Sequence, residues 1–140
     1  MNKLMQYLVY VDDGWGVWRG SLQELKILTK KANEINPKFQ VTLDHTAGDQ
    51  KRLRILDIEA WVGGNGRIEH QFYRKETAKD YCLVATSSHS LKVKANYIQS
   101  EVMRIRMNCS KQEYAWHHLE RFRHRLMKGG YPIWFIDLHY

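Results

Sequence analysis

The 140-residue sequence has few cysteines and no long apolar run. Its two cysteines, Cys82 and Cys109, form no CxxC pair, which favours free buried thiols in a reducing compartment over a disulfide. No segment approaches the roughly 20 apolar residues of a membrane span. The first residues also lack the apolar core and the cleavage site of a signal peptide. These absences predict a soluble intracellular chain, nuclear or cytoplasmic, with no membrane partner.

Positive charge is unevenly distributed along the chain. The formal net charge is +7. Residues 1–66 contain 9 Lys and Arg against 8 Asp and Glu, whereas residues 67–140 contain 13 against 7. The second part therefore carries a net charge of +6, which predicts a polyanionic partner. A solvated surface with no partner is the alternative.

Local signals predict a β-hairpin followed by a helix in the first third of the chain. The hairpin is expected over Leu8–Trp18, because Asp-Asp-Gly separates two runs of strand-forming residues. The helix is expected over about 21–36, where Ser21 and Glu24 form a capping box and an apolar stripe follows. Pro37 ends this helix.

Alternating apolar residues predict antiparallel strands in the middle of the chain. The alternation covers Phe39 to Leu43 and then Leu56 to Val62. Gly63–Gly66 can adopt the positive φ angles of a tight turn, and a returning strand would reach about Thr77. The pattern is typical of an antiparallel meander.

The last third of the sequence predicts helices. Apolar residues recur at helical spacing from Leu91 to Ile105, and Ser110 with Glu113 forms a second capping box for a helix that continues through Met127. Five basic side chains are expected on one broad face of that helix: His117, Arg121, His124, Arg125 and Lys128. Such a face suits phosphate contact and plain solvation equally well. Together the patterns predict an α+β fold, with strands first and helices last.

Two adjacent carboxylates, Asp12 and Asp13, lie in the predicted hairpin turn. Oxygen ligands held close together on ordered backbone suit a hard divalent cation such as Mg²⁺. Two such ions, roughly 3.5–4 Å apart, promote nucleotidyl transfer. A turn with no further role is the alternative, because Asp and Gly are common turn residues.

Longer motifs of the chain resemble reverse transcriptases, or RNA-directed DNA polymerases, of the Penelope-like retroelement type. Tyr-Val-Asp-Asp at residues 10–13 resembles the aspartate-pair motif of their palm domain. Three later segments resemble the region that follows in this family: a Gly-turn hairpin at 53–77, a Ser-x-His to Cys-Ser segment at 87–110 and a Gly-Tyr-Pro segment at 126–132. The similarity covers roughly residues 7–132.

The resemblance implies a partial, antiparallel palm-type sheet that carries the aspartate pair on a hairpin. Residues 1–80 would form this part of the palm with a primer-grip-like hairpin, and residues 81–140 would form a helical, thumb-like region. These polymerases need a third catalytic carboxylate from an upstream strand. The chain therefore resembles the carboxyl-terminal part of a polymerase domain, and we expect it to be inactive by itself.

The same resemblance implies roles for individual residues. Asp12 and Asp13 would be the catalytic ligands of Mg²⁺, and Tyr10 would lie near the primer end. The partners would be an RNA template, a DNA primer in an RNA–DNA duplex, and deoxynucleoside triphosphates. The other implied nucleic-acid contacts are Tyr73, Arg74, Lys75, Arg104, Arg121, Arg125 and Lys128.

Two alternatives to a polymerase fragment remain at this point. One is a non-catalytic nucleic-acid-binding remnant, in which the helical face still binds a duplex. The other is a small α+β domain whose aspartates only form a turn. A zinc site is not predicted, because the spacing of Cys109, His117 and His118 fits no zinc-binding pattern.

Overall fold

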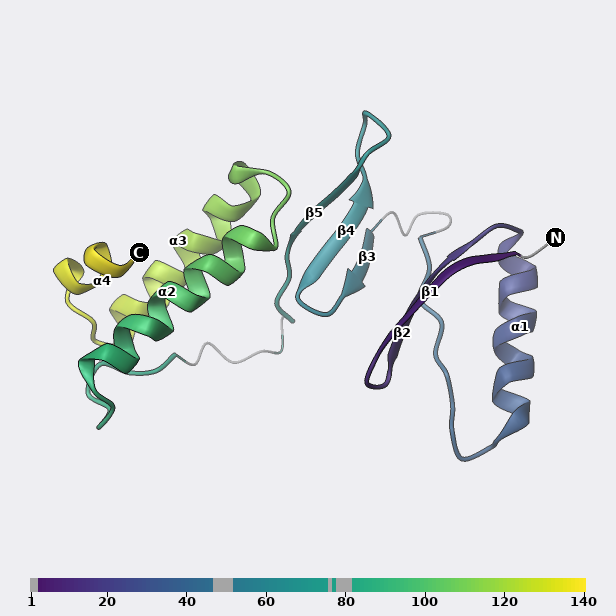
Figure 1. The fold of residues 1–140 in the computed structure, drawn as a ribbon, viewed down its shortest axis with the longest axis horizontal. Coiled ribbons are helices and arrows are strands. Elements are labelled where there is room, and N and C mark those ends of the chain that lie inside the picture. The colour runs from purple at the N-terminus through teal and green to yellow at the C-terminus, as the bar shows by residue number, and fades with distance from the viewer. Residues whose placement is uncertain (1–2, 47–51, 76, 78–81) are drawn as a thin grey trace. The chain divides into compact units, whose positions relative to one another are not determined.

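The computed structural model describes residues 3–46, 52–75, 77 and 82–140, and the chain divides into two compact units, Met1–Leu53 and Arg54–Tyr140 (Figure 1). The described residues form two small antiparallel sheets and four helices. The predicted α+β class is therefore confirmed. None of the described helices is long and apolar enough to cross a membrane.

The first unit begins with the predicted hairpin. Strand β1 (Leu4–Tyr10) pairs antiparallel with strand β2 (Asp13–Trp18), and Tyr10 lies opposite Asp13. The turn between them consists of Val11 and Asp12, and Val11 has a φ of 56°. A positive φ is rare for a β-branched residue, because its side chain crowds the backbone. The turn that carries the aspartates is therefore a strained one.

Helix α1 (Leu22–Ile35) follows and has the predicted capping box. The backbone N–H of Glu24 donates to Ser21 Oγ at 3.2 Å, and the N–H of Ser21 donates to Glu24 Oε2 at 3.0 Å. Lys3 forms an ion pair with the same carboxylate. These contacts attach the start of the helix to the hairpin.

The strand predicted at Phe39 to Leu43 is not formed. The side chain of Asn33 occupies the backbone groups that a sheet ladder would need at Val41. Val41 N–H donates to Asn33 Oδ1 at 2.6 Å, and Asn33 Nδ2 donates to the Val41 carbonyl at 3.0 Å. The chain therefore returns along α1 as an irregular segment held by one asparagine.

A second sheet contains strands β3 (Arg52–Ile55), β4 (Ile58–Val62) and β5 (Ile68–Phe72), in the order β3-β4-β5. Sequence alternation placed Leu56 within a strand, but this residue lies in the turn between β3 and β4 with a φ of 51°. Strands β4 and β5 form a regular hairpin, as Gly63–Gly66 predicts.

Three helices complete the second unit: α2 (Leu91–Met107), α3 (Gln112–Lys128) and α4 (Ile133–His139). The predicted helices are confirmed, but the second capping box is not. Helix α3 begins after Lys111, which makes no side-chain cap, because the hydroxyl of Ser110 is hydrogen-bonded to strand β5 instead.

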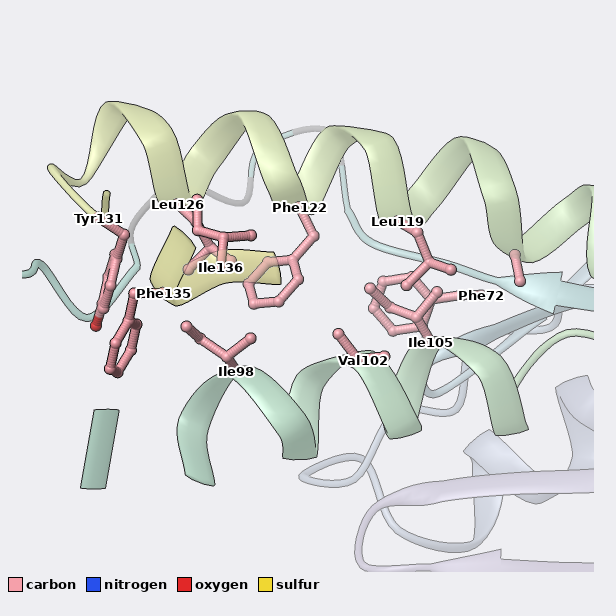
Figure 2. Packing of buried hydrophobic residues seen from close by; sticks show 11 residues of the cluster. Phe72, Ile98, Val102, Ile105, Leu119, Phe122, Leu126, Tyr131, Phe135 and Ile136 are labelled. Atoms are coloured by element: carbon pink, nitrogen blue, oxygen red, sulfur yellow. The ribbon is translucent and has the colours of Figure 1, made fainter. Parts of the chain in front are cut away.

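The hydrophobic core lies between the three helices and one residue of the sheet (Figure 2). Phe122 from α3 is fully buried at its centre. The core consists of Phe72, Ile98, Val102, Ile105, Ala115, Leu119, Phe122, Leu126, Tyr131, Phe135 and Ile136. No described residue of the first unit is buried to the same degree. The core therefore belongs entirely to the second unit.

Candidate nucleic-acid interface

Helices α2 and α3 form a pair that is joined by the four residues Asn108–Lys111. Figure 2 shows the two helices side by side, with Ile98 and Val102 of α2 facing Phe122 of α3. Buried positions recur at intervals of three or four residues on both helices, so one apolar face of each is committed to the core. The opposite faces are left exposed.

The connection between the two helices packs on the edge of strand β5. Ser110 N–H donates to the His70 carbonyl at 2.8 Å, and His70 N–H donates to Ser110 Oγ at 3.0 Å. His70 Nδ1 lies 3.1 Å from the Asn108 carbonyl oxygen. Phe72 N–H donates to Cys109 Sγ at 3.3 Å, and burial raises the pKa of that thiol. The connection therefore covers an otherwise unpaired sheet edge.

A polar anchor that sequence reasoning missed joins β5 to the start of α3. Glu69 is buried and accepts a hydrogen bond from Tyr114 Oη at 2.5 Å, and its other oxygen lies 2.8 Å from Lys111 Nζ. The bond from Lys111 lowers the pKa of Glu69. The ring of Trp61 meets the Tyr114 ring edge-on at 5.3 Å. More than 40 residues separate Glu69 from its partners, so no local pattern predicts the contact.

The exposed face of α3 carries a row of basic and histidine side chains. The spacing of four, three and four residues places them on one side of the helix. We call this row the α3 stripe, and it consists of His117, Arg121, His124 and Lys128, all exposed. Glu120 is exposed beside it. The stripe points away from the core and is available to a partner.

Arg125, which was predicted on the same face, is buried instead. The residue is 8% exposed, with Nη2 at 3.9 Å from Glu101 Oε1 and the guanidinium carbon 5.2 Å from the centre of the Phe122 ring. The prediction of an exposed Arg125 is therefore wrong. At a helix position on the border between core and solvent, the long aliphatic stem of arginine can pack inward.

The structure brings four other predicted contacts together, around a pocket of about 370 Å³. Its lining consists of Leu56, Asp57, Phe72, Tyr73, Arg74, Lys75 and Arg104. Arg104 Nη1 bonds Asp57 Oδ2 at 2.6 Å, and two further bonds to Glu101 at 2.9 Å raise the pKa of Arg104. Much of the Arg104 charge is therefore neutralised within the unit.

The remaining predicted site residues lie at the tip of the hairpin in the first unit. Tyr10, Asp12 and Asp13 are all exposed there. Among the described residues, no group of three or more His, Cys, Asp and Glu side chains is placed to hold a metal ion. The two aspartates thus have no third carboxylate beside them in the described part of the chain. Binding of Mg²⁺ by this pair stays a prediction.

Residues 81–140 match the family of animal helix-turn-helix domains. No curated protein and no solved structure matches the chain. The matched segment contains α2, α3 and α4, and the four-residue connection between α2 and α3 has a length typical of helix-turn-helix motifs. Helix-turn-helix motifs are known from DNA-binding proteins, so the match suggests nucleic-acid binding for this segment.

The match overturns the identification of the chain as a reverse transcriptase. Residues 81–140 match a helix-turn-helix family, whereas the resemblance to reverse transcriptases implied a polymerase thumb for the same residues. The resemblance rested on short motifs separated by long gaps, and such motifs can arise from turn and cap preferences alone. The palm-type and thumb-like descriptions depended on it, and neither the structure nor the match supports them.

Proposed function

We propose that the helical region of this protein binds double-stranded DNA, with the α3 stripe facing the duplex. One observation carries the proposal: α3, the second of the three helices in the matched segment, exposes Arg121, Lys128 and two histidines on the side opposite its buried face. In helix-turn-helix proteins the second helix enters the major groove. The core fixes α3 against α2, so the stripe reaches the duplex as a rigid surface.

Charge supports the same assignment. Residues 67–140 carry a net charge of +6, and several of these cations are exposed on the second unit. Lysine and arginine side chains that neutralise DNA phosphates release condensed counterions, so the affinity falls steeply as salt rises. We therefore expect binding with a strong salt dependence and a modest sequence preference.

The test measures binding of the full chain to a fluorescent DNA duplex of about 20 base pairs, a length that covers two turns of the major groove. The variant is Arg121→Glu/Lys128→Glu. The matched control is Lys30→Glu/Lys31→Glu, which makes the same charge change at exposed positions of α1. Loss of two phosphate contacts should lower the slope of log affinity against log salt by about 2. Equal losses in variant and control would remove α3 from the interface.

The same assay identifies the preferred nucleic acid. An RNA–DNA hybrid and a single strand of the same sequence are compared with the duplex. B-form DNA has a major groove that admits a helix, whereas the A-like hybrid has a deep and narrow one. We expect the DNA duplex to bind most tightly. Tighter binding of the hybrid would contradict major-groove docking and favour recognition of A-form shape.

A second candidate function is divalent-cation binding by Asp12 and Asp13. It is favoured by the positive φ of Val11, because strained backbone tends to persist at functional sites. Broadening of amide NMR signals by Mn²⁺ should be centred on this turn and should disappear in Asp12→Asn. Asp44→Asn, at another exposed aspartate, is the matched control. Amide broadening that is spread evenly over all exposed carboxylates would contradict a specific cation site at Asp12 and Asp13.

Nucleotidyl transfer by the same pair is tested separately, by primer extension on an RNA template. We expect no synthesis from this chain alone, because within the described residues only two carboxylates gather at the turn and neither has a third ligand beside it. Synthesis that is lost in Asp12→Asn would establish that the turn is catalytic.

A further inference from the structure

The hairpin between β4 and β5 ends in a small, ordered loop that projects away from the helices (Figure 1). Gly63 N–H donates to the Arg67 carbonyl at 2.8 Å, Gly66 N–H donates to the Gly63 carbonyl at 2.9 Å, and Arg67 N–H donates to Asn65 Oδ1 at 3.0 Å. A Cβ atom added at Gly64 or Gly66 would meet nothing within 4 Å. The loop is therefore internally bonded and surrounded by open space.

Arg67 is the one charged side chain of this loop, and it is exposed. Among the described residues no ion pair to it is found. This sets it apart from Arg104, whose guanidinium is bonded to Asp57 and Glu101. The guanidinium of Arg67 is thus available for an external anion.

The position of the loop relative to α3 is fixed by the polar anchor. Glu69 lies two residues beyond Arg67 on β5, which corresponds to about 7 Å along a strand. Its carboxylate is bonded to Lys111 and Tyr114 at the start of α3. One turn of helix further on, the α3 stripe begins at His117. The strand that carries the loop is therefore attached to the start of α3 by contacts within a single unit.

We infer that this loop is a second contact with the nucleic acid, in which Arg67 binds a backbone phosphate of the same duplex that the α3 stripe faces. The inference rests on the proposed function and extends it from one helix to a two-part surface. Arginine suits the role, because its planar guanidinium forms paired hydrogen bonds with phosphate oxygens. Gly64 and Gly66 have no side chains, so the backbone of the loop can approach the duplex closely at these two positions.

The geometry also explains why such a contact strengthens binding. A flexible loop would lose conformational freedom on binding, whereas this loop is already ordered by its own hydrogen bonds. Two contact points on one rigid unit also fix the orientation of the duplex, which a single helix does not. Phosphate contacts of this kind set the register of a protein on DNA without reading its sequence.

The experiment compares Arg67→Glu with Lys30→Glu in the full chain, on the same DNA duplex. Both variants change the net charge equally, so long-range electrostatic effects cancel in the comparison. Loss of one phosphate contact should lower the salt slope by about 1 and should weaken binding roughly five- to tenfold relative to Lys30→Glu at moderate salt. Arg67→Lys should weaken binding less than Arg67→Glu does, because an ammonium keeps the positive charge but cannot form the paired hydrogen bonds of a guanidinium.

Phosphate-ethylation interference then locates the contact. Arg67→Glu should lose interference at one cluster of phosphates and keep the cluster that Arg121→Glu/Lys128→Glu loses. If Arg67→Glu binds no more weakly than Lys30→Glu, or if its interference pattern is unchanged, the loop is not part of the interface. That result would overturn the role of Arg67 but would not affect the proposal that the α3 stripe binds DNA. If the α3 double variant also binds like its own control, the proposed function itself fails.

Discussion

The two units of the chain contain similar apolar residues, but only one unit buries them. In the second unit Phe122, Ile98 and Leu126 are completely buried. In the first unit Leu8 is 57% exposed and Val9 is 62% exposed, although both lie in a regular strand. Local structure is thus well formed in both units, whereas a core is present in only one.

The difference shows that a β-hairpin and one helix cannot bury a hydrophobic core without a further layer of structure. Along β1, apolar side chains alternate to both faces of the hairpin, and a single amphipathic helix can cover at most one of them. Two strands with one unburied face are marginally stable in water. The free energy of unfolding of this chain therefore resides in Arg54–Tyr140.

The largest expected effect comes from emptying the centre of that core. Phe122→Ala should lower the free energy of unfolding by about 3–5 kcal/mol, because it removes a fully buried ring and leaves a cavity. Leu28→Ala on α1, where the side chain is 47% exposed, should cost less than about 1 kcal/mol. Urea denaturation followed by circular dichroism measures both values. Equal costs would show that the first unit has a core of its own.

A smaller effect, of opposite sign, is expected in the first unit. Val11→Gly should stabilise the hairpin by about 1 kcal/mol, because glycine adopts a positive φ without the crowding of a β-branched side chain. Hydrogen exchange of the β1 and β2 amides is the measurement. Val9→Gly, within β1 itself, is the control and should speed exchange. Faster exchange in Val11→Gly would mean that the turn is not strained.

The smallest expected effect is a pH dependence of the stability, which arises from a histidine at the border between core and solvent. Burial lowers the pKa of His118, whose ring meets Phe72 edge-on at 5.4 Å. The unfolded chain, with a histidine pKa of about 6.5, then binds a proton before the folded chain does. Stability should therefore be highest above about pH 6.5 and should fall as the pH drops through the lowered value.

Thermal unfolding of the parent chain and of His118→Gln between pH 7 and pH 5 checks this dependence. The variant should show a smaller loss of melting temperature, whereas His89→Gln, at an exposed position outside the core, should behave like the parent. The effect is modest because the His118 side chain is half-buried and solvent screens its charge. An identical pH response in parent and His118→Gln would contradict the assignment.

The parts of the fold that could be predicted from sequence are those set by neighbouring residues. The first hairpin and the Ser21–Glu24 capping box appear as expected, because their partners lie within a few residues, although the hairpin turn consists of Val11 and Asp12 instead of Asp-Asp-Gly. The box at Ser110 failed, since His70, 40 residues away, takes its hydroxyl. The strand at Phe39 to Leu43 failed because the Asn33 side chain competes for its backbone.

In the candidate site, too, only features set by neighbouring residues could be predicted from the sequence. Helical spacing correctly placed Arg121 and Lys128 on an exposed face, but it could not show that Arg125, at the border of that face, turns inward toward Glu101. The anchor between Glu69 and Tyr114 joins two elements that are distant in sequence, so periodicity gives no sign of it. Such contacts depend on tertiary packing.

The measurement that tests the central claim most directly is an NMR titration of the full chain with duplex DNA. Amide shifts report where the duplex binds, whatever the affinity. Binding through the α3 stripe, as proposed, predicts the largest shifts at His117, Arg121, His124 and Lys128 on α3, with small shifts along β1 and β2. Large shifts confined to the first unit, with α3 unchanged at saturation, would contradict the account.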